Sequence, residues 1–128
     1  MRLFFAIIIA MNSAFVFTDG AEFSFLEGKS HRFEDAIEGE VLKHEFVFIN
    51  SGDHPLMISS YKVACSCTVI SFPEEPVLPG EKGVLSLSFD TNGKYGFQKR
   101  KIEIVSNAKK SITLLFKVVV IPKEAVKE

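Results

Sequence analysis

The two cysteines of the chain, Cys65 and Cys67, stand one residue apart between apolar runs. Thiols at this spacing could form a disulfide, bind a soft metal ion or fill apolar core in the reduced form. On an ideal strand their Cα atoms would lie about 6.6 Å apart, at roughly 3.3 Å per residue. Disulfides join Cα atoms about 4.4–6.8 Å apart, so a bond requires a local bend or bulge. We expect it to add little loop-closure stability, because the closed loop is very short.

Three interpretations of this pair are open. A structural disulfide, or two buried thiols, is favoured because an oxidising compartment promotes pairing and cysteine packs as a small apolar side chain. A Cu(I) or Zn(II) site would need further ligands, and His31, His44 and His54 are scattered along the sequence. A redox-active pair is usually Cys-x-x-Cys in a βαβ setting, and neither feature is present. Cys65 and Cys67 are therefore the disulfide candidate and, as the alternative, soft-metal ligands.

The remainder of the sequence carries no recognisable catalytic motif. There is no Gly-x-Ser-x-Gly elbow, no phosphate-binding loop and no His-Glu-x-x-His zinc motif. The 15 basic and 16 acidic residues give a net charge of −1, whereas a nucleic-acid-binding surface needs clustered Lys and Arg in excess. The densest basic run, residues 99–101, is interpreted as a solvated strand edge. We expect no catalytic residue, no enzyme activity, no cofactor and no nucleic-acid partner.

The N-terminus has the pattern of a secretory signal peptide. Met1 and Arg2 give a short positive region, and residues 3–17 are almost wholly apolar. This stretch is shorter than the ~20 apolar residues that span a bilayer, and small residues before Ala21 suit cleavage there. We predict a signal peptide over residues 1–20, export to the periplasm or the cell surface, and no stable membrane anchor after cleavage. An uncleaved anchor is the alternative.

The rest of the chain alternates with period two and is interrupted at short intervals by Gly and Pro. Residues 41–50 are the clearest strand, and two phenylalanines mark the face that we expect to line the core. Residues 65–72 are expected to be extended. About seven or eight short strands separated by turns predict an all-β antiparallel sandwich over residues 21–122, followed by a charged tail at residues 123–128.

Four motifs carry a resemblance to a known family. They are Asn-Ser-Gly-Asp-His-Pro-Leu at residues 50–56, Ala-Cys-Ser-Cys-Thr at 64–68, Pro-Gly-Glu-Lys-Gly at 79–83 and Ser-Asn at 106–107. In this order they resemble the bacterial family called domain of unknown function fifteen seventy-three. Ala64 and Ser66 depart from its Ser-Cys-Gly-Cys-Thr pattern. The resemblance implies a secreted immunoglobulin-like sandwich, related in architecture to ASH, major sperm protein and PapD-like domains, and it implies no activity.

The predicted function is a non-catalytic binding or scaffolding module with a protein as the possible partner. Residues 111–121 are apolar on both faces towards their end, so this last strand could pair edge to edge with a partner. The same pattern fits a central strand of the chain's own sheet, which is the favoured alternative. The second functional hypothesis is a periplasmic soft-metal-binding or thiol-redox protein that uses Cys65 and Cys67. The sequence leaves the oligomeric state open.

Overall fold

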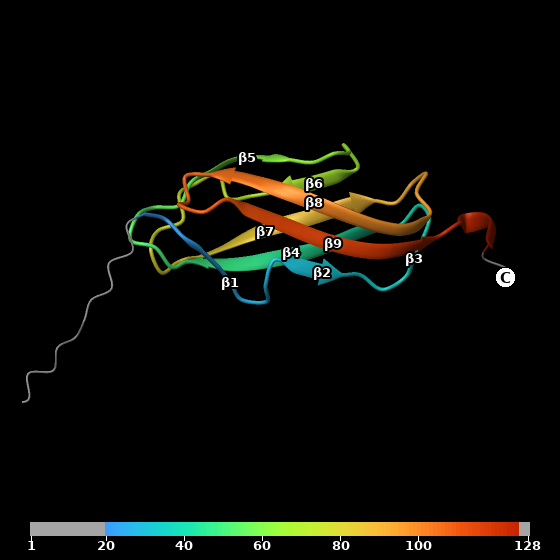
Figure 1. Cartoon of the computed structure of the whole chain (residues 1–128), viewed down its shortest axis with the longest axis horizontal. Helices are drawn as coiled ribbons and strands as arrows, with labels where there is room; N and C mark the ends of the chain where they lie inside the picture. The colour runs from blue at the N-terminus through green and yellow to red at the C-terminus, as the bar shows by residue number, and fades with distance from the viewer. Residues whose placement is uncertain (1–19, 126–128) are drawn as a thin grey trace, which may run out of the picture.

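Two β-sheets pack face to face in the computed structural model, which describes residues 20–125 (Figure 1). The predicted signal peptide, apart from Gly20, lies outside the described residues. The four-stranded sheet has the order β1-β4-β7-β6, with the bounds β1 Phe23–Phe25, β4 Val41–Asn50, β7 Lys82–Asp90 and β6 Thr68–Ser71. The five-stranded sheet has the order β2-β9-β8-β5, and β3 also pairs with β9; the bounds are β2 Ser30–Arg32, β3 Ala36–Ile37, β5 Ile58–Lys62, β8 Gly96–Ser106 and β9 Ile112–Ile121.

This architecture confirms the predicted all-β sandwich. A single short 3-10 turn, η1 (Lys123–Ala125), follows β9 in the part predicted to be a charged tail. Within residues 20–125, no helix is long and apolar enough to cross a membrane.

The N-terminal segment departs from the predicted antiparallel pattern. β1 pairs antiparallel with β4, and the chain then crosses to the other sheet, where β2 and β3 run parallel to β9. Gly28 lies at this crossing with a φ of 83°, a left-handed conformation that glycine adopts without a Cβ clash. One segment thus supplies an outer strand to each sheet. Period-two alternation could not show this, because it does not report strand direction.

Apolar side chains from alternate strand positions fill the space between the sheets. The predicted core face of residues 41–50 is confirmed, since Phe46 and Phe48 are buried. The sheets meet where Phe89 of β7 packs against Phe116 of β9, with ring centroids 4.9 Å apart. Burial of an apolar side chain of this size stabilises a fold by about 1.5–3 kcal/mol.

The last strand is central in its sheet. β9 pairs with β8 over residues 112–120, and β2 and β3 lie along its other side. The prediction that residues 111–121 offer an edge to a partner is therefore wrong, and the alternative of a central strand is confirmed. The apolar pattern has a packing reason. Val118 and Val120 are buried in the core, whereas Val119 and Ile121 are half-buried on the outer face.

Three of the four sequence motifs meet where β4 ends and β7 begins, which we call the Asn50 end. Asn50 is fully buried. Its side-chain amide donates to the carbonyls of His54 (2.7 Å) and Val77 (2.9 Å) and accepts from the N–H groups of Gly52 (3.0 Å) and Glu22 (3.3 Å). Its backbone N–H and C=O bond to the loop before β7. One amide therefore joins three loops.

The Asn50 end is also tied to the five-stranded sheet. The Asn107 side chain accepts from the N–H of Met57 (2.8 Å) and donates to the carbonyl of Pro55 (2.9 Å). Gly83 packs under Phe48, so closely that a Cβ there would lie 2.4 Å from the ring. The motifs at residues 50–56, 79–83 and 106–107 are thus explained by packing and hydrogen bonds within the fold.

Candidate functional site

The Cys65-Ser66-Cys67 segment is a tight turn that a disulfide closes. The sulfur atoms lie 2.08 Å apart and the Cα atoms 5.2 Å apart. The N–H of Thr68 donates to the carbonyl of Cys65 (3.2 Å), and the N–H of Cys67 lies 3.1 Å from Cys65 Sγ. The prediction that residues 65–72 form one extended segment is wrong for residues 65–67. The physical reason is that two bonded cysteines bring their Cα atoms closer than the ~6.6 Å of a strand.

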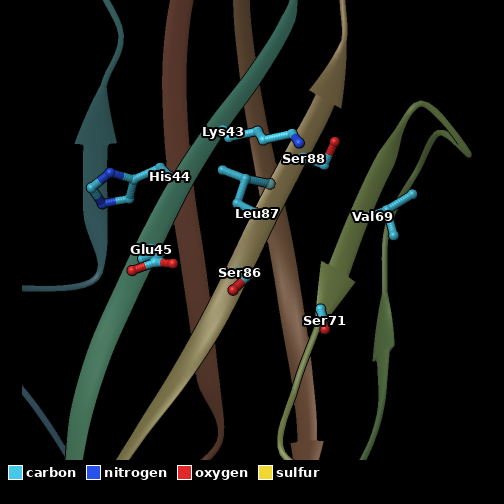
Figure 2. Close-up of a pocket in the computed structure, with 8 residues that line it drawn as sticks. All are labelled: Lys43, His44, Glu45, Val69, Ser71, Ser86, Leu87 and Ser88. Atoms are coloured by element: carbon cyan, nitrogen blue, oxygen red, sulfur yellow. The ribbon is translucent and has the colours of Figure 1, made fainter.

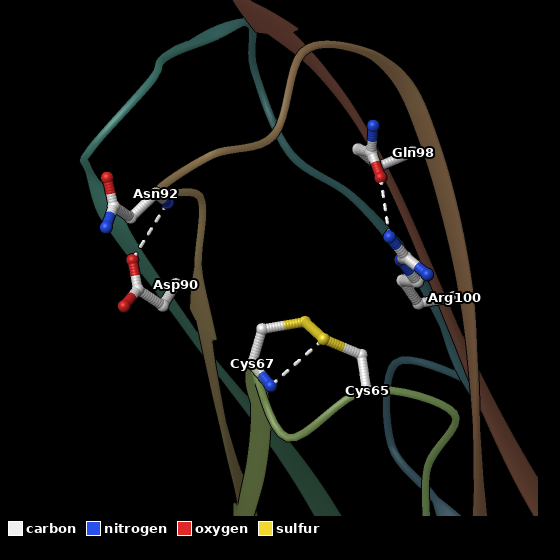
Figure 3. Close-up of a disulfide and its surroundings, with 6 residues drawn as sticks. All are labelled: Cys65, Cys67, Asp90, Asn92, Gln98 and Arg100. Atoms are coloured by element: carbon white, nitrogen blue, oxygen red, sulfur yellow. Dashed lines mark hydrogen bonds between the residues drawn. A yellow bond between two sulfur atoms is a disulfide. The ribbon is translucent and has the colours of Figure 1, made fainter.

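The turn carries the chain from one sheet to the other, along the side bounded by β5 and β6 (Figure 1). Both cysteines are half-buried, and Cys67 packs against the core. The carbonyl of Cys67 accepts a hydrogen bond from the N–H of Asp90 (2.9 Å) at the end of β7. Figure 3 shows the disulfide between this strand end and the side chains of Gln98 and Arg100 on β8. We call this region the disulfide side.

Arg100 also lies on the disulfide side, and no motif in the sequence marks it as a site residue. It stands on the inward face of β8, and its guanidinium lies 6.0 Å from the ring centroid of Phe89. Its Nη2 donates to Oε1 of Gln98 (2.7 Å). Its Nε is buried, and among residues 20–125 no acceptor bonds to it. The available signal was an arginine on the face that Ile102 and Ile104 occupy, where an apolar side chain is usual.

β8 has a free edge on this side. β5 pairs with β8 only at residues 103–106, so within the part of the chain that the structure describes, residues 97–101 have a strand partner on one side alone. Leu115 and Lys117 direct their backbone bonds at β2, because the Leu115 N–H donates to Lys29 and the Lys117 carbonyl accepts from Phe33. The direction of the backbone N–H and C=O groups alternates along a strand. Leu114, Phe116 and Val118 therefore direct theirs at β8.

The consequence for β8 follows from the register. The residues that face β9 with their backbone groups are Gln98 and Arg100, which pair with Val118 and Phe116. Phe97, Lys99 and Lys101 therefore point their N–H and C=O groups away from β9, to a side where no strand of the described residues lies. We call residues 97–101 the β8 edge. Unpaired groups of this kind are a template for pairing with another strand.

A concavity lies on the outer face of the four-stranded sheet. It has a volume of about 650 Å³ and is lined by polar and apolar side chains, among them Lys43, Glu45, Val69, Ser71, Ser86 and Ser88 (Figure 2). Lys43 and Glu45 are the cross-strand partners of Ser88 and Ser86, but no hydrogen bond joins either pair. Strand alternation turns the side chain of His44 to the other face of β4, and Figure 2 shows its imidazole pointing away from Ser86 and Ser88 towards β2. Within residues 20–125, the groove therefore holds no hydrogen-bonded pair of a nucleophile and a base.

The histidines do not gather around the cysteines. His31 of β2 stacks on His44 of β4, with ring centroids 3.6 Å apart. Burial lowers the pKa of His44, the charge of His31 lowers it further, and the carboxylates of Glu27 and Glu45 oppose this. His54 lies at the Asn50 end.

The third histidine has its own partner. His54 Nδ1 lies 2.7 Å from Oδ1 of Asp53. The pKa of Asp53 is lowered first by the backbone N–H of Gly20 and then by the hydrogen bond to His54. Among the described residues, no group of three His, Cys, Asp or Glu side chains could hold a metal ion. The structure thus brings Cys65 and Cys67 together and leaves the histidines elsewhere.

Comparison with known proteins identifies a family that matches most of the chain. The model of the family described as "Protein of unknown function (DUF1573)" matches residues 24–120. No curated protein matches the sequence closely enough to count as a relative.

Solved structures share the architecture at low identity. A protein of unknown function from Porphyromonas gingivalis has a TM-score of 0.66 at 16% identity, over 77% of this chain and 46% of that chain. The VesB protease of Vibrio cholerae has a TM-score of 0.62 at 12% identity, over 76% and 31%. The ASH / PapD-like domain 7 of human CEP192 has a TM-score of 0.60 at 14% identity, over 80% and 85%. The chain thus spans less than half of the first two proteins and matches the third as a whole domain.

Proposed function

The chain belongs to the family of proteins of unknown function DUF1573, and on that premise we propose that it is an exported, non-catalytic module that binds a protein partner. The PapD-like, immunoglobulin-like fold supports a module of this kind. No group of three His, Cys, Asp or Glu side chains within residues 20–125 could hold a metal ion. Export rests on the positive, apolar N-terminus of the sequence.

The observation that carries the proposal is the β8 edge. Phe97, Lys99 and Lys101 hold unpaired backbone groups in a strand that is otherwise well anchored to β9. A partner strand that adds to such an edge gains a ladder of main-chain hydrogen bonds. The terminal strand β9 plays no part in this, because both of its sides are occupied.

Site-specific photo-crosslinking in intact cells tests the proposal. A benzoylphenylalanine at position 97 stands beside the β8 edge, and the matched control at position 69 stands on the outer face of the other sheet. Phe97 and Val69 are comparably exposed, at 59% and 50%. We expect one protein adduct of defined mass from position 97 and none from position 69. Equal adducts from both positions, or none from either, would contradict a specific protein-binding edge.

A proline variant makes the same experiment specific for main-chain pairing. Lys99→Pro removes the N–H that points away from β9 and leaves the β8–β9 ladder intact. Lys99→Thr removes the charge and keeps the N–H. We expect Lys99→Pro to abolish the adduct from position 97 and Lys99→Thr to retain most of it. Loss of the adduct in both variants would show that the charge, and not the strand edge, is the determinant.

Compartment is tested separately by fractionation. We expect the chain in the periplasmic or the extracellular fraction, with Ala21 or a residue near it as the new N-terminus. A full-length chain that begins with Met1 and stays in the membrane pellet would contradict cleavage and support the uncleaved anchor.

A thiol-redox role is the second candidate, and one observation favours it. The Cys65–Cys67 bond lies half-buried on the open side of the sandwich, where a small reductant can reach it. Alkylation followed by mass spectrometry tests this. Thiols that are labelled only after mild reduction support a redox role, and an unlabelled bond supports a structural one. The soft-metal alternative is not favoured, because no third ligand lies near the sulfurs among the described residues.

A further inference from the structure

The outer face of the five-stranded sheet carries a row of positive charge. Arg32 of β2 is in register with Lys117 of β9, and Lys117 is in register with Lys99 of β8. Residues directly opposite each other on neighbouring strands project from the same face. Three cations thus stand side by side across three strands. We call them the basic row.

The basic row has no internal counter-charge. Among residues 20–125, no ion pair involves any of its three side chains. Glu34 and Asp35 lie two and three residues after Arg32, yet neither forms an ion pair with the row. Like charges directly opposite each other destabilise a sheet. The arrangement therefore costs the free chain stability that an anionic partner would restore.

Next to the basic row lies an exposed apolar patch. Phe97 is two residues from Lys99 on β8, is 59% exposed and pairs with Val119. Ile37 and Ile121 pair with each other further along the same face. Lys101 continues the positive charge in the other direction along β8, at an exposed position. The β8 edge thus presents, at every second residue, one apolar and two positive side chains.

On these observations we propose that the β8 edge binds an extended, acidic segment of a partner protein, which adds as a further strand. This inference rests on the proposed protein-binding function and names its partner class. A strand that runs antiparallel to β8 places its outward side chains opposite Lys101, Lys99 and Phe97 in turn. The complementary pattern is acidic-x-acidic-x-apolar, with a spacing of two residues.

The inward side chains of such a strand meet Gln98 and Arg100. The Arg100 side chain is half-buried, and a docked residue with a hydroxyl or carboxylate oxygen could accept a hydrogen bond from its guanidinium. This gives the intervening positions a polar preference next to the disulfide (Figure 3). The partner is thus a polypeptide, since only a peptide backbone satisfies the ladder and both rows of side chains together.

A second copy of this chain does not fit the edge. Antiparallel self-pairing centred on Lys99 places that lysine opposite its own symmetry mate. Centring the pair one step along places Lys99 opposite Lys101. Both registers bring like charges together, and a pair centred on Gln98 places Lys99 opposite Phe97, so none of the three registers gives the lysines a counter-charge. Lysines on an exposed edge are a known device against edge-to-edge association. Charge complementarity therefore selects an acidic partner and disfavours a homodimer.

Amide-resolved NMR on the chain recovered after export tests the proposal. The probe is an acetylated, amidated nonapeptide with the core Asp-Thr-Asp-Thr-Phe, and its control has Lys in place of both Asp. In the free chain we expect fast amide exchange at Phe97, Lys99 and Lys101 and slow exchange at Gln98 and Arg100. On titration with the acidic peptide, the three fast amides should become protected and shift, and the basic peptide should leave them unchanged.

Changes of side-chain charge and loss of a backbone N–H should each weaken binding of the acidic peptide, and separate variants test the two effects. The double variant Lys99→Glu, Lys101→Glu should weaken binding of the acidic peptide by about tenfold or more and favour the basic control. Lys99→Pro should remove protection of the edge amides even with Arg32 and Lys117 in place. Higher ionic strength should weaken binding in the unaltered chain.

Three outcomes would overturn the proposal. One is equal binding of both peptides, and the second is a shift of residues on the groove of the other sheet. The third is binding of anionic phosphatidylglycerol vesicles without binding of the acidic peptide, which would assign the basic row to a membrane surface. If any of these three outcomes is found but position 97 still forms a protein adduct in cells, the protein-binding function is retained and only the acidic sequence of the partner strand is rejected. Loss of the adducts as well would reject both.

Discussion

The Asn50 end and the disulfide side treat buried polar groups in opposite ways. At the Asn50 end, one buried amide makes four side-chain hydrogen bonds to three loops. On the disulfide side, the buried Nε of Arg100 has no acceptor within the described residues. A buried polar group normally has a partner, because its lost hydration is otherwise uncompensated. The buried amide of Asn50 is thus fully hydrogen-bonded within the fold, whereas the buried Nε–H of Arg100 is left without a hydrogen bond among the described residues.

The comparison separates structural motifs from candidate functional ones. Three of the four family-like motifs lie at the Asn50 end, and each has a structural explanation. The Cys-Ser-Cys motif alone lies on the disulfide side, next to the β8 edge. Substitutions at the Asn50 end should therefore affect folding, and substitutions on the disulfide side should affect folding little.

The largest effect is expected at Asn50. Asn50→Ala leaves the carbonyls of His54 and Val77 and the N–H of Gly52 without partners in a buried site, so we expect the free energy of unfolding to fall by about 3 kcal/mol or more. Urea denaturation followed by circular dichroism measures it. Asn92→Ala, at an exposed loop position, is the control and should change stability little. A small loss at Asn50 would break the distinction between the two regions.

Removal of the disulfide should have a smaller effect. With Cys65 and Cys67 both changed to Ser, we expect a loss of about 1.5 kcal/mol, the loop-entropy value for so short a closed loop. The same denaturation experiment measures it, with the unaltered chain under reducing conditions as a second reference. A loss as large as that of Asn50→Ala would make the turn a structural element equal to the Asn50 end.

Acid should weaken the contact between the sheets at the stacked histidines. The pKa of His44 in the fold lies below its ordinary 6.5 because of burial and the charge of His31. The stability from the neutral ring is fully present above pH 6.5 and is lost as the pH falls towards the folded pKa. Urea midpoints at about pH 7.5 and about pH 5 should show the decrease. His44→Phe, which does not titrate, should show a smaller one, and an equal decrease would assign the effect to other groups.

The smallest effect is expected at Arg100. Arg100→Met removes the buried Nε without an acceptor and keeps an unbranched side chain beside Phe89, so we expect stability unchanged or raised by up to about 1 kcal/mol. Thermal melts are sufficient to detect it. Gln98→Met separates the loss of the Arg100–Gln98 bond from the removal of the guanidinium. A clear destabilisation by Arg100→Met alone would show that the guanidinium supports the fold.

The sequence predicted the parts of the structure that alternation and turn chemistry encode. Phe46 and Phe48 line the core as expected. Strand direction and sheet membership were not predictable in this way. The split of the N-terminal segment between two sheets, and the parallel pairing of β2 with β9, depend on contacts between distant residues.

The site was less predictable than the fold. The spacing of Cys65 and Cys67 correctly implied that a bond would need a bend. The β8 edge could not be inferred, because it exists only where β5 stops pairing at residues 103–106. The basic row joins Arg32, Lys99 and Lys117 from three strands, and only the register brings them together. Sequence runs such as residues 99–101 show charge density but not which charges become neighbours.

The split N-terminal segment has a consequence for the order of assembly. β1 can pair as soon as β4 has been synthesised, but β2 and β3 must wait for β9, the last strand within residues 20–125. Pairings between strands far apart in the sequence are slow to form, because a long loop must close first. Until β9 has been synthesised, the parallel side of the five-stranded sheet cannot form. The sheet that carries the β8 edge is therefore completed only after every other strand of the described residues has been made.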